Sequence, residues 1–421
     1  MPVVLAGPGA VGGQVVFEWL ARKRQKFWWV TRGGMPFLIT RTPSAVESLR
    51  AAGLRYELAR RRPVFRPIAY FAMAIGWIIT ATVGAARAAR ADVAQCNERF
   101  WPRLRAYSFA ALAHNATPDD MQRLHTRTGR DVAEAPELLF NRDRRIWYGL
   151  NAIQGAEPND VQDKARFASI CREHSLPAVP VLAAFFGGKL VVPPDCEAMA
   201  GRDLFTKSLR GNLGQGAALW QWNGNGWSCD GETCATLEIL LTRLSSEDCV
   251  VQRALIDHQV FRAAGSKGLS SLRIVTICPP DGRARAIAAT MLLSRGTISQ
   301  TGAILGVDMD RGQAVNCLDL AINKVLTLDE VGIVLSALPD WQAHLDLVCH
   351  AHEQAFPRFA SLGWDVVLTD EGPFLLEANL GWGMLLHETL DRAFGATALV
   401  EAAPAWSRLL NGTPHARFKT T

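Results

Sequence analysis

The sequence lacks the cysteine patterns of a disulfide-stabilised protein or a zinc finger. Its nine cysteines are an odd number, they are scattered, and no two form a Cys-x-x-Cys pair. The nearest two are Cys229 and Cys234, and no second pair follows at zinc-finger spacing. Small secreted domains depend on paired cysteines, whereas cytosolic thiols stay reduced. We therefore expect reduced thiols in a cytosolic chain, with neither a disulfide framework nor a zinc site.

The sequence also lacks a bias toward disorder, and its first part is poor in acidic residues. Of 421 residues, 49% are hydrophobic and 20% are charged, which is ordinary for a globular protein long enough for two or three subdomains. Residues 1–110 carry 17 Lys and Arg against 5 Asp and Glu, whereas residues 111–421 carry 28 against 35. The net charge of +5 thus hides a basic N-terminal region with its own expected partner.

A glycine-rich segment near the start matches the G-x-G-x-x-G pattern at Gly7, Gly9 and Gly12. Such a turn can hold a dinucleotide pyrophosphate. Here the preceding apolar run is short, Pro8 lies inside the turn, and no acidic residue follows in place for a ribose hydroxyl. We favour a structural or non-native leader, and an NAD-dependent oxidoreductase stays as an alternative.

Twenty uncharged residues, 67–86, form an apolar run bounded by arginines. A bilayer span needs about 20 apolar residues, so this run has the minimum length, and Ala, Gly and Thr dilute its hydrophobicity. Three interpretations stay open: a span, a helix lying on the inner leaflet with arginines on anionic lipid, or a helix buried against the main domain. The run starts too late for a cleaved signal peptide. The flanking arginines are Arg60, Arg61, Arg62, Arg66, Arg87 and Arg90.

A hairpin is predicted near the end of the chain, with strands at 364–368 and 373–378 joined by a turn at 369–372. Because side chains alternate along a strand, Glu377 and Asn379 share a face that Asp365 can join. Carboxylate and amide oxygens are the ligands that Mg2+ prefers. A surface hairpin with solvated acids is the alternative, but Glu377 ends an apolar run where an unpaired buried carboxylate would be costly.

Basic residues precede this hairpin at several places in the sequence. Lys207 ends a predicted strand and leads into a loop with Gly211, Gly214 and Gly216, where backbone amides can converge on phosphate oxygens. The lysine precedes the glycines, which excludes a Walker A loop, and an ordinary hairpin is the alternative. Arg273 lies in an otherwise apolar strand, where a buried cation needs an anion such as a triphosphate or an acyl phosphate.

Taken in order, these motifs resemble the ATP-grasp superfamily over about residues 160–385. The segments Ser-Leu-Arg-Ile-Val-Thr-Ile at 271–277 and Glu-Ala-Asn-Leu-Gly-Trp-Gly at 377–383 are most similar to the sugar-transfer-associated branch, also described as alpha-L-glutamate ligase-related. The resemblance implies an α+β ATP-grasp fold, with two α/β subdomains clamping ATP, preceded by a basic, helical N-terminal region. The expected parts are residues 1–110 with an apolar helix at 67–86, a helical lead-in at 111–160, an ATP-grasp domain at 161–411 and a tail at 412–421.

The resemblance also assigns roles to residues of this chain. It places Asp365, Glu377 and Asn379 on Mg2+, and it places Arg273 and Arg295 on the transferred group as catalytic residues. In relatives of the D-alanyl-D-alanine ligase type an Arg lies two positions before the metal-binding Asp. This chain has Gly363 there, so Arg273 or Arg295 is expected to take its place. The residues expected to bind ATP are Lys164 and Lys207 with Gly211, Gly214 and Gly216 on the phosphates, Gln252, Ala254 and Leu255 at the adenine, and Asp257, or alternatively Gln259, at the ribose.

The implied activity is an ATP-dependent carboxylate-amine ligation through an acyl phosphate, with ATP and Mg2+ as cofactors. In such phosphoryl transfer the protein supplies mainly position and charge. The expected partners are a small or glycan-linked carboxylate, an amine, and a membrane surface through residues 60–90, with no nucleic acid. We expect a cytoplasmic enzyme at the inner face of the membrane that acts in surface-polysaccharide or cell-envelope synthesis. The alternatives are an inactive nucleotide-binding protein tethered to a membrane assembly, and a kinase on the same fold.

Overall fold

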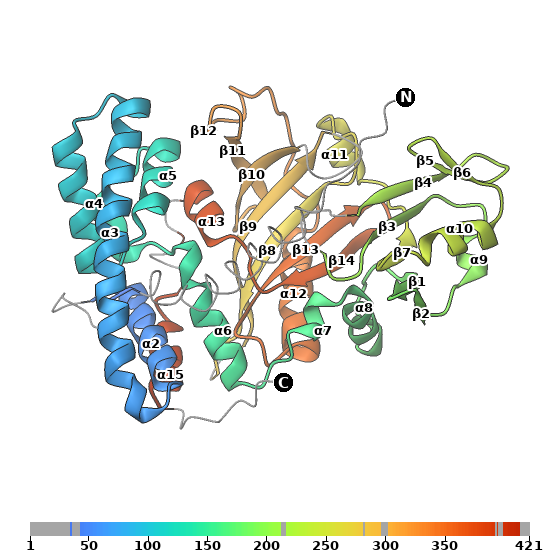
Figure 1. Ribbon diagram of the computed structural model, residues 1–421. Helices are drawn as coiled ribbons and strands as arrows, with labels where there is room; N and C mark the ends of the chain where they lie inside the picture. The colour runs from blue at the N-terminus through green and yellow to red at the C-terminus, as the bar shows by residue number, and fades with distance from the viewer. Residues whose placement is uncertain are drawn as a thin grey trace, which may run out of the picture.

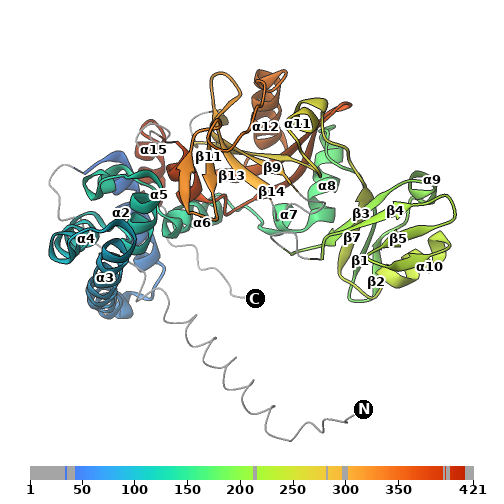
Figure 2. The same cartoon turned by 90° about the horizontal axis from the view of Figure 1, so that it is seen from above.

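The structure is a computed structural model that describes residues 34–35, 43–211, 216–280, 283–295, 302–391, 394 and 399–412. Within these ranges the N-terminal helices, a central sheet within residues 271–379 and an outer sheet within residues 181–253 lie in a row (Figures 1 and 2). The predicted leader with Gly7, Gly9 and Gly12 lies outside the described residues. So do Gly214 of the predicted phosphate loop and the tail from residue 413.

The N-terminal helices pack around a helix that is longer than the predicted apolar run. This helix, α3, continues ten residues beyond position 86 and ends before Asn97, whose φ of 55° stops it in the left-handed region. One face of α3, including Met73, Trp77 and Ala81, is buried. The opposite face is exposed. The helices of this region are α2 (Ala45–Ala59), α3 (Arg66–Cys96), α4 (Phe100–His114) and α5 (Pro118–Thr128), with short 3-10 helices at Pro63–Phe65, Val132–Glu137 and Asn141–Asp143.

The first sheet is small, antiparallel and covered by two short helices. Its strands are arranged in the order β2-β1-β7-β3-β4-β5-β6. Leu204, Trp220 and Val251 are among its buried residues. Its elements are β1 (Val181–Phe186), β2 (Lys189–Val192), α9 (Cys196–Met199), β3 (Leu204–Ser208), β4 (Ala218–Trp222), β5 (Trp227–Cys229), β6 (Glu232–Cys234), α10 (Leu237–Leu244) and β7 (Cys249–Arg253).

The second sheet has the order β12-β11-β10-β9-β8-β13-β14, and its neighbouring strands are antiparallel. On one face Phe167, Phe356 and Trp364 form an aromatic core. Its elements are α6 (Arg144–Ile153), α7 (Asn159–Gln162), α8 (Lys164–Glu173), α11 (Gln259–Ala263), β8 (Ser271–Ile277), β9 (Arg285–Ser294), β10 (Gly302–Asp308), β11 (Gln313–Asp319), β12 (Lys324–Leu326), α12 (Trp341–Ala355), β13 (Ser361–Thr369), β14 (Gly372–Asn379), α13 (Met384–Leu390) and α15 (Ala403–Gly412).

The other face of this sheet shares a core with the N-terminal region. Leu49 and Tyr56 of α2 pack in one cluster with Trp147 of α6 and Trp406 of α15. A buried ion pair between Arg130 Nη1 and Glu388 Oε2, 2.9 Å apart, joins the residues after α5 to α13. The helical region is therefore packed onto the sheet that carries the candidate site.

Candidate functional site

The hairpin β13–β14 contains both predicted strands and extends each of them. Trp364 and Val366 face the aromatic core and are fully buried. Since strand side chains alternate, Asp365 faces the other side of the sheet. The register places Asp365 opposite Glu377 on β14 and opposite Arg273 on β8. Three charged side chains thus meet on one face across three adjacent strands.

The three predicted metal ligands contact one another. Asn379 Nδ2 donates to Asp365 Oδ2 at 3.2 Å and to Glu377 Oε1 at 3.1 Å. Arg273 donates both Nε and Nη2 to the Asp365 carboxylate, with Nη2 2.9 Å from Oδ2. The structure therefore brings Asp365, Glu377 and Asn379 together, as the alternation argument predicts. Their role as metal ligands stays a prediction.

Lys164, from another element, reaches the Glu377 carboxylate. Lys164 is the first residue of α8, and Asp163 caps this helix because its side chain accepts from the amides of Ala165 and Arg166. Its Nζ lies 3.7 Å from Glu377 Oε2 and donates to the Gly211 carbonyl at 2.8 Å. The segment after α8 pairs with β14 through the Leu375 amide, 2.8 Å from the Pro177 carbonyl oxygen. This pairing fixes α8 beside the hairpin.

The charged groups of this cluster alter one another's pKa. Burial lowers the pKa of Lys207, on β3 of the first sheet, to about 8, although Glu377 favours its charged form. Burial also raises the pKa of Asp365 to about 6, which Arg273 opposes and Glu377 reinforces. For Glu377, burial disfavours the carboxylate, but Lys207 and Lys164 outweigh it and the pKa is lowered. Lysines from both sides of the site thus hold one carboxylate ionised.

The cluster fits a divalent cation held together with phosphates. Two carboxylates and one amide oxygen are hard ligands of the type that Mg2+ takes. Burial, reinforced by the nearby Glu377 carboxylate, raises the pKa of Asp365 despite its contact with Arg273, so further positive charge at this position would favour its ionised form. A divalent cation would supply that charge. The lysines would face the anionic groups that complete its coordination.

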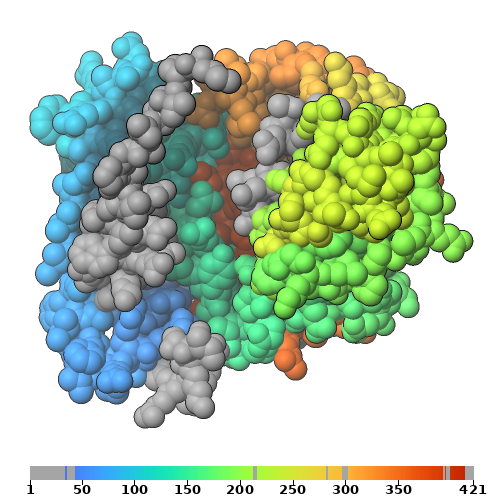
Figure 3. All heavy atoms as spheres, turned by 45° about the vertical axis from the view of Figure 1, so that its right-hand side comes forward, coloured from blue at the N-terminus to red at the C-terminus, as the bar shows by residue number. Residues whose placement is uncertain are grey.

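The site lies between the two sheets. Figure 3 brings the lobe of the first sheet forward and shows a hollow between this lobe and the N-terminal helices, with the C-terminal part of the chain, in red, at its floor. Lys207 belongs to the lobe, whereas Asp365 and Glu377 belong to the second sheet. A ligand that contacts all of them must therefore lie between the lobes.

Comparison with known families agrees with this arrangement. A family model described as sugar-transfer associated ATP-grasp matches residues 144–393, which include both sheets and α13. The chain belongs to the sugar-transfer associated ATP-grasp family. A comparison with curated proteins gave no match.

Solved structures with detectable likeness to this ATP-grasp chain are distant. The L-amino acid ligase from Bacillus licheniformis is 13% identical over 63% of this chain and 55% of its own, with a TM-score of 0.35. The D-alanine-D-alanine ligase from Coxiella burnetii is 10% identical over 63% and 64%, with a TM-score of 0.33. This chain thus spans little more than half of the first ligase. The family model alone carries the assignment.

The residues predicted at the adenine and ribose already have partners in the protein. Gln252 Nε2 donates to the Val179 carbonyl at 3.1 Å, and the Ala254 amide donates to the Asp203 backbone carbonyl at 3.0 Å. The Asp257 carboxylate accepts from the amide and hydroxyl of Ser270 at 2.7 and 2.8 Å. These bonds give Asp257 a structural role at the start of β8. Leu255 is half-buried, and nucleotide binding by these residues stays a prediction.

Sequence reasoning missed how the hairpin turn holds the linker between the sheets. The turn was predicted only as a connection, yet Glu371 pairs with Arg253 at 2.6 Å and Asp370 accepts from the Gln259 amide at 3.0 Å. The His258 amide also donates to the Leu368 carbonyl at 2.9 Å. Acidic residues are common in solvent-exposed turns. The local sequence therefore gives no sign that these two contact the linker.

Of the two predicted catalytic arginines, the structure brings Arg273 into the cluster. A Cβ at Gly363 would lie 2.3 Å from Trp382 Cβ and 3.2 Å from Arg273 Cδ, so the stem of Arg273 passes over this glycine. Arg273 therefore lies beside the position where the ligase-like relatives carry their arginine. Arg295 is exposed directly after β9, and the residues that follow it, 296–301, lie outside the described ranges. Its catalytic role stays a prediction.

Proposed function

We propose that this ATP-grasp protein is a carboxylate-amine ligase that works through an acyl phosphate. The observation that supports this is the meeting of Lys164 and Lys207, from the elements predicted to hold phosphate, with Asp365, Glu377 and Asn379. In the proposed reaction a carboxylate oxygen attacks the γ-phosphorus and ADP leaves. The amine nitrogen then attacks the acyl carbon, loses a proton, and phosphate leaves.

The chain's own side chains would divide this work. Bound Mg2+ would neutralise the phosphates and polarise the transferred group, held by Asp365, Glu377 and Asn379. Lys164 and Lys207 would bind phosphate oxygens, and Glu377 would keep both lysines in place when ATP is absent. Arg273 would fix the Asp365 carboxylate through its two-pronged contact and add positive charge beside the transferred group.

The activity test uses the full chain with Mg2+-ATP and a panel of small and glycan-linked acids paired with amines. ADP release that requires both an acid and an amine, with an amide product by mass spectrometry, would support the ligase. A phosphorylated acceptor without amide would indicate the kinase alternative. Saturable ATP binding without turnover of any pair would favour the nucleotide-binding alternative.

Lys207→Ala is expected to weaken binding of a Mg2+-ATP analogue by about tenfold to a hundredfold, since hydrogen bonds to charged groups contribute about 1.5–3 kcal/mol.

Because the pKa of Lys207 is about 8, wild-type affinity should fall as the pH rises above 8 and the ammonium loses its proton. Lys207→Arg keeps its charge and should bind with little pH dependence. Calorimetric titration of wild type and both variants from pH 7 to 9.5 measures the affinity and its pH dependence. A wild-type affinity that stays constant above pH 8 would remove Lys207 from the phosphate site.

We further propose that this enzyme attaches to an anionic membrane surface through α3. The segment Pro63–Cys96 is long and apolar enough to cross a membrane by length and composition. Its buried face packs on α4 and α5, while Phe71, Ile75 and Ile79 on the opposite face are 57–64% exposed. A helix with one packed face and one exposed apolar face fits surface attachment better than a span. The arginines before it would contact anionic headgroups.

Replacing Phe71 and Ile75 with Ser should lower binding to phosphatidylserine-containing vesicles by at least about tenfold, because each apolar side chain contributes roughly 1.5–3 kcal/mol when fully removed from water. Cosedimentation of the full chain measures the bound fraction. The matched control, Leu190→Ser with Ile239→Ser, changes exposed residues of the distant lobe and should bind like wild type. Equal loss in both double variants, or no wild-type binding, would contradict membrane attachment.

A further inference from the structure

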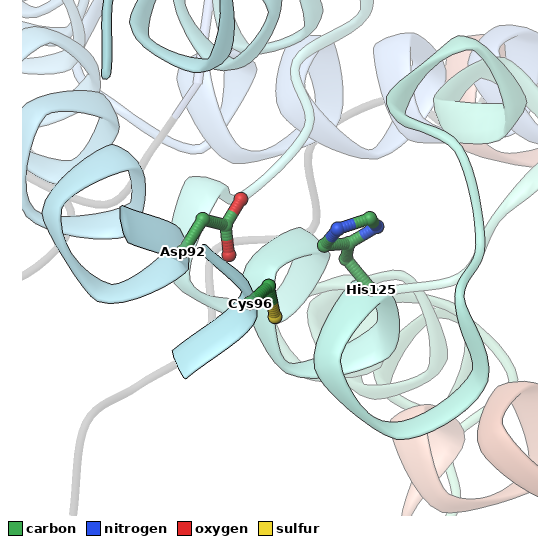
Figure 4. Close-up of side chains that lie close together, drawn as sticks. All are labelled: Asp92, Cys96 and His125. Carbon is green, nitrogen blue, oxygen red and sulfur yellow. The ribbon is translucent and has the colours of Figure 1, made fainter. Parts of the chain in front are cut away.

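A second group of metal-binding side chains lies in the N-terminal helices, outside the ATP site. Asp92 and Cys96 are four residues apart near the end of α3 and so share a face, and His125 lies on α5. One ligand atom from each lies within 4.8 Å of the other two. Figure 4 shows the three side chains gathered between the two helices.

Asp92 is fully buried, but only one of its carboxylate oxygens has partners. Oδ2 accepts from the Tyr107 hydroxyl at 2.7 Å and from Arg103 Nε at 2.6 Å. Oδ1 is buried without a hydrogen-bond partner among the described residues. Leaving a buried acceptor unpaired costs about 1–3 kcal/mol, so a donor or a cation is expected at this atom. Tyr107 and Arg103 orient the carboxylate as outer partners orient a metal ligand.

His125 turns its second ring nitrogen, Nε2, toward the carboxylate of Glu98. Its Nδ1 lies 3.0 Å from the Arg130 carbonyl oxygen, which only accepts, so Nδ1 carries the proton. In the neutral ring Nε2 is then an acceptor, and it lies 3.8 Å from Glu98 Oε1, another acceptor. The chain brings Glu98 here by turning at Asn97, at a φ of 55°. Two facing acceptors need either an extra proton on the ring or a shared cation.

We propose that Asp92, Cys96, His125 and Glu98 bind a Zn2+ ion that clamps α3 to α5. A thiolate, an imidazole and carboxylates are zinc ligands, and the sulfur disfavours Mg2+ and Ca2+. Ligand atoms about 2.0–2.3 Å from zinc lie roughly 3.3–3.8 Å apart in a tetrahedron, so the side chains must close by about 1 Å. Binding releases the Cys96 proton. Four protein ligands would fill the coordination sphere, which indicates a structural rather than a catalytic ion.

The test begins with full-length protein freed of metal by a chelator and titrated with Zn2+ against a chromophoric chelator. We expect one tight equivalent, and Co2+ in its place should give a thiolate charge-transfer band. Cys96→Ser and His125→Gln should lower zinc affinity by at least about 100-fold, because even outer-shell changes cost 10–100-fold. Cys196→Ser, at another exposed cysteine on α9, is the matched control and should bind like wild type.

A thermal measurement separates a clamp from loose surface binding. Zinc should raise the unfolding temperature of wild type and of Cys196→Ser but not of Cys96→Ser, since a ligand that binds only the folded state stabilises it. Cys96 is exposed, so its serine variant tests the proposal even if His125→Gln folds poorly. Wild type without tight zinc, or with zinc affinity unchanged by Cys96→Ser, would overturn the proposal. The His125–Glu98 contact would then be an ion pair.

Discussion

Glu377→Gln is expected to lower the rate of ATP turnover by about 10³-fold, the largest effect on activity that we foresee. The change removes a charged metal ligand and the carboxylate that Lys164 and Lys207 share. Electrostatic groups of this kind contribute about 10²–10³ in kcat when removed singly. The side chain keeps its shape, so the loss should appear in ADP release without a large fall in unfolding temperature. The Mg2+ concentration needed for half-maximal ATP-analogue binding should rise as well.

Glu238→Gln is the matched control for this variant. Glu238 is exposed in the first turn of α10, on the outer side of the first lobe, and its change should leave ADP release unaltered. If folded Glu377→Gln turned over ATP within tenfold of wild type, with an unchanged Mg2+ requirement, the metal site would have to lie elsewhere.

Gly363→Ala is expected to lower the free energy of unfolding by about 3 kcal/mol or more, the largest stability effect. The added Cβ would lie 2.3 Å from Trp382 Cβ, an atom fixed to the backbone that cannot swing away. Overpacking typically costs about 1–3 kcal/mol, and this contact is closer than side-chain adjustment can relieve. Urea unfolding should show the midpoint of the first transition shifted down with its slope kept.

Gly381→Ala provides the control close in sequence. A Cβ there would find only the Tyr148 hydroxyl at 3.9 Å, so stability should change by no more than about 0.5 kcal/mol. Because the Arg273 stem also lies 3.2 Å from the Gly363 position, the alanine should disturb Asp365 and weaken ATP-analogue binding too. Wild-type stability in Gly363→Ala would show that Trp382 can move, and that this glycine is not needed for packing.

Local pattern was enough to predict the hairpin, because alternation along two strands and a short turn decide which side chains share a face. Asp365, Glu377 and Asn379 could therefore be placed together from sequence. The same holds for the strand that carries Arg273. The order of these motifs resembles that of the ATP-grasp superfamily, and the family match confirms this resemblance.

The partners of polar side chains could not be predicted in this way. The carboxylate of Asp257, which was predicted at the ribose, accepts hydrogen bonds from Ser266 and Ser270. These partners depend on how the linker folds back onto β8. Likewise, the spacing of cysteines excluded zinc-finger pairs and gave no reason to join Cys96 to His125. That pairing arises only because α3 and α5 pack together.

By itself, the sequence determined the hairpin of the ATP-grasp domain, the face on which its carboxylates meet, and the apolar character of residues 67–86. These depend on interactions between residues close in the chain or directly opposite in a hairpin. The tertiary structure alone decided that Lys164 shares Glu377 with Lys207, that Arg273 fills the space over Gly363, and that only one face of α3 is exposed. Each of these joins segments far apart in sequence, and their contacts follow from how sheets and helices pack.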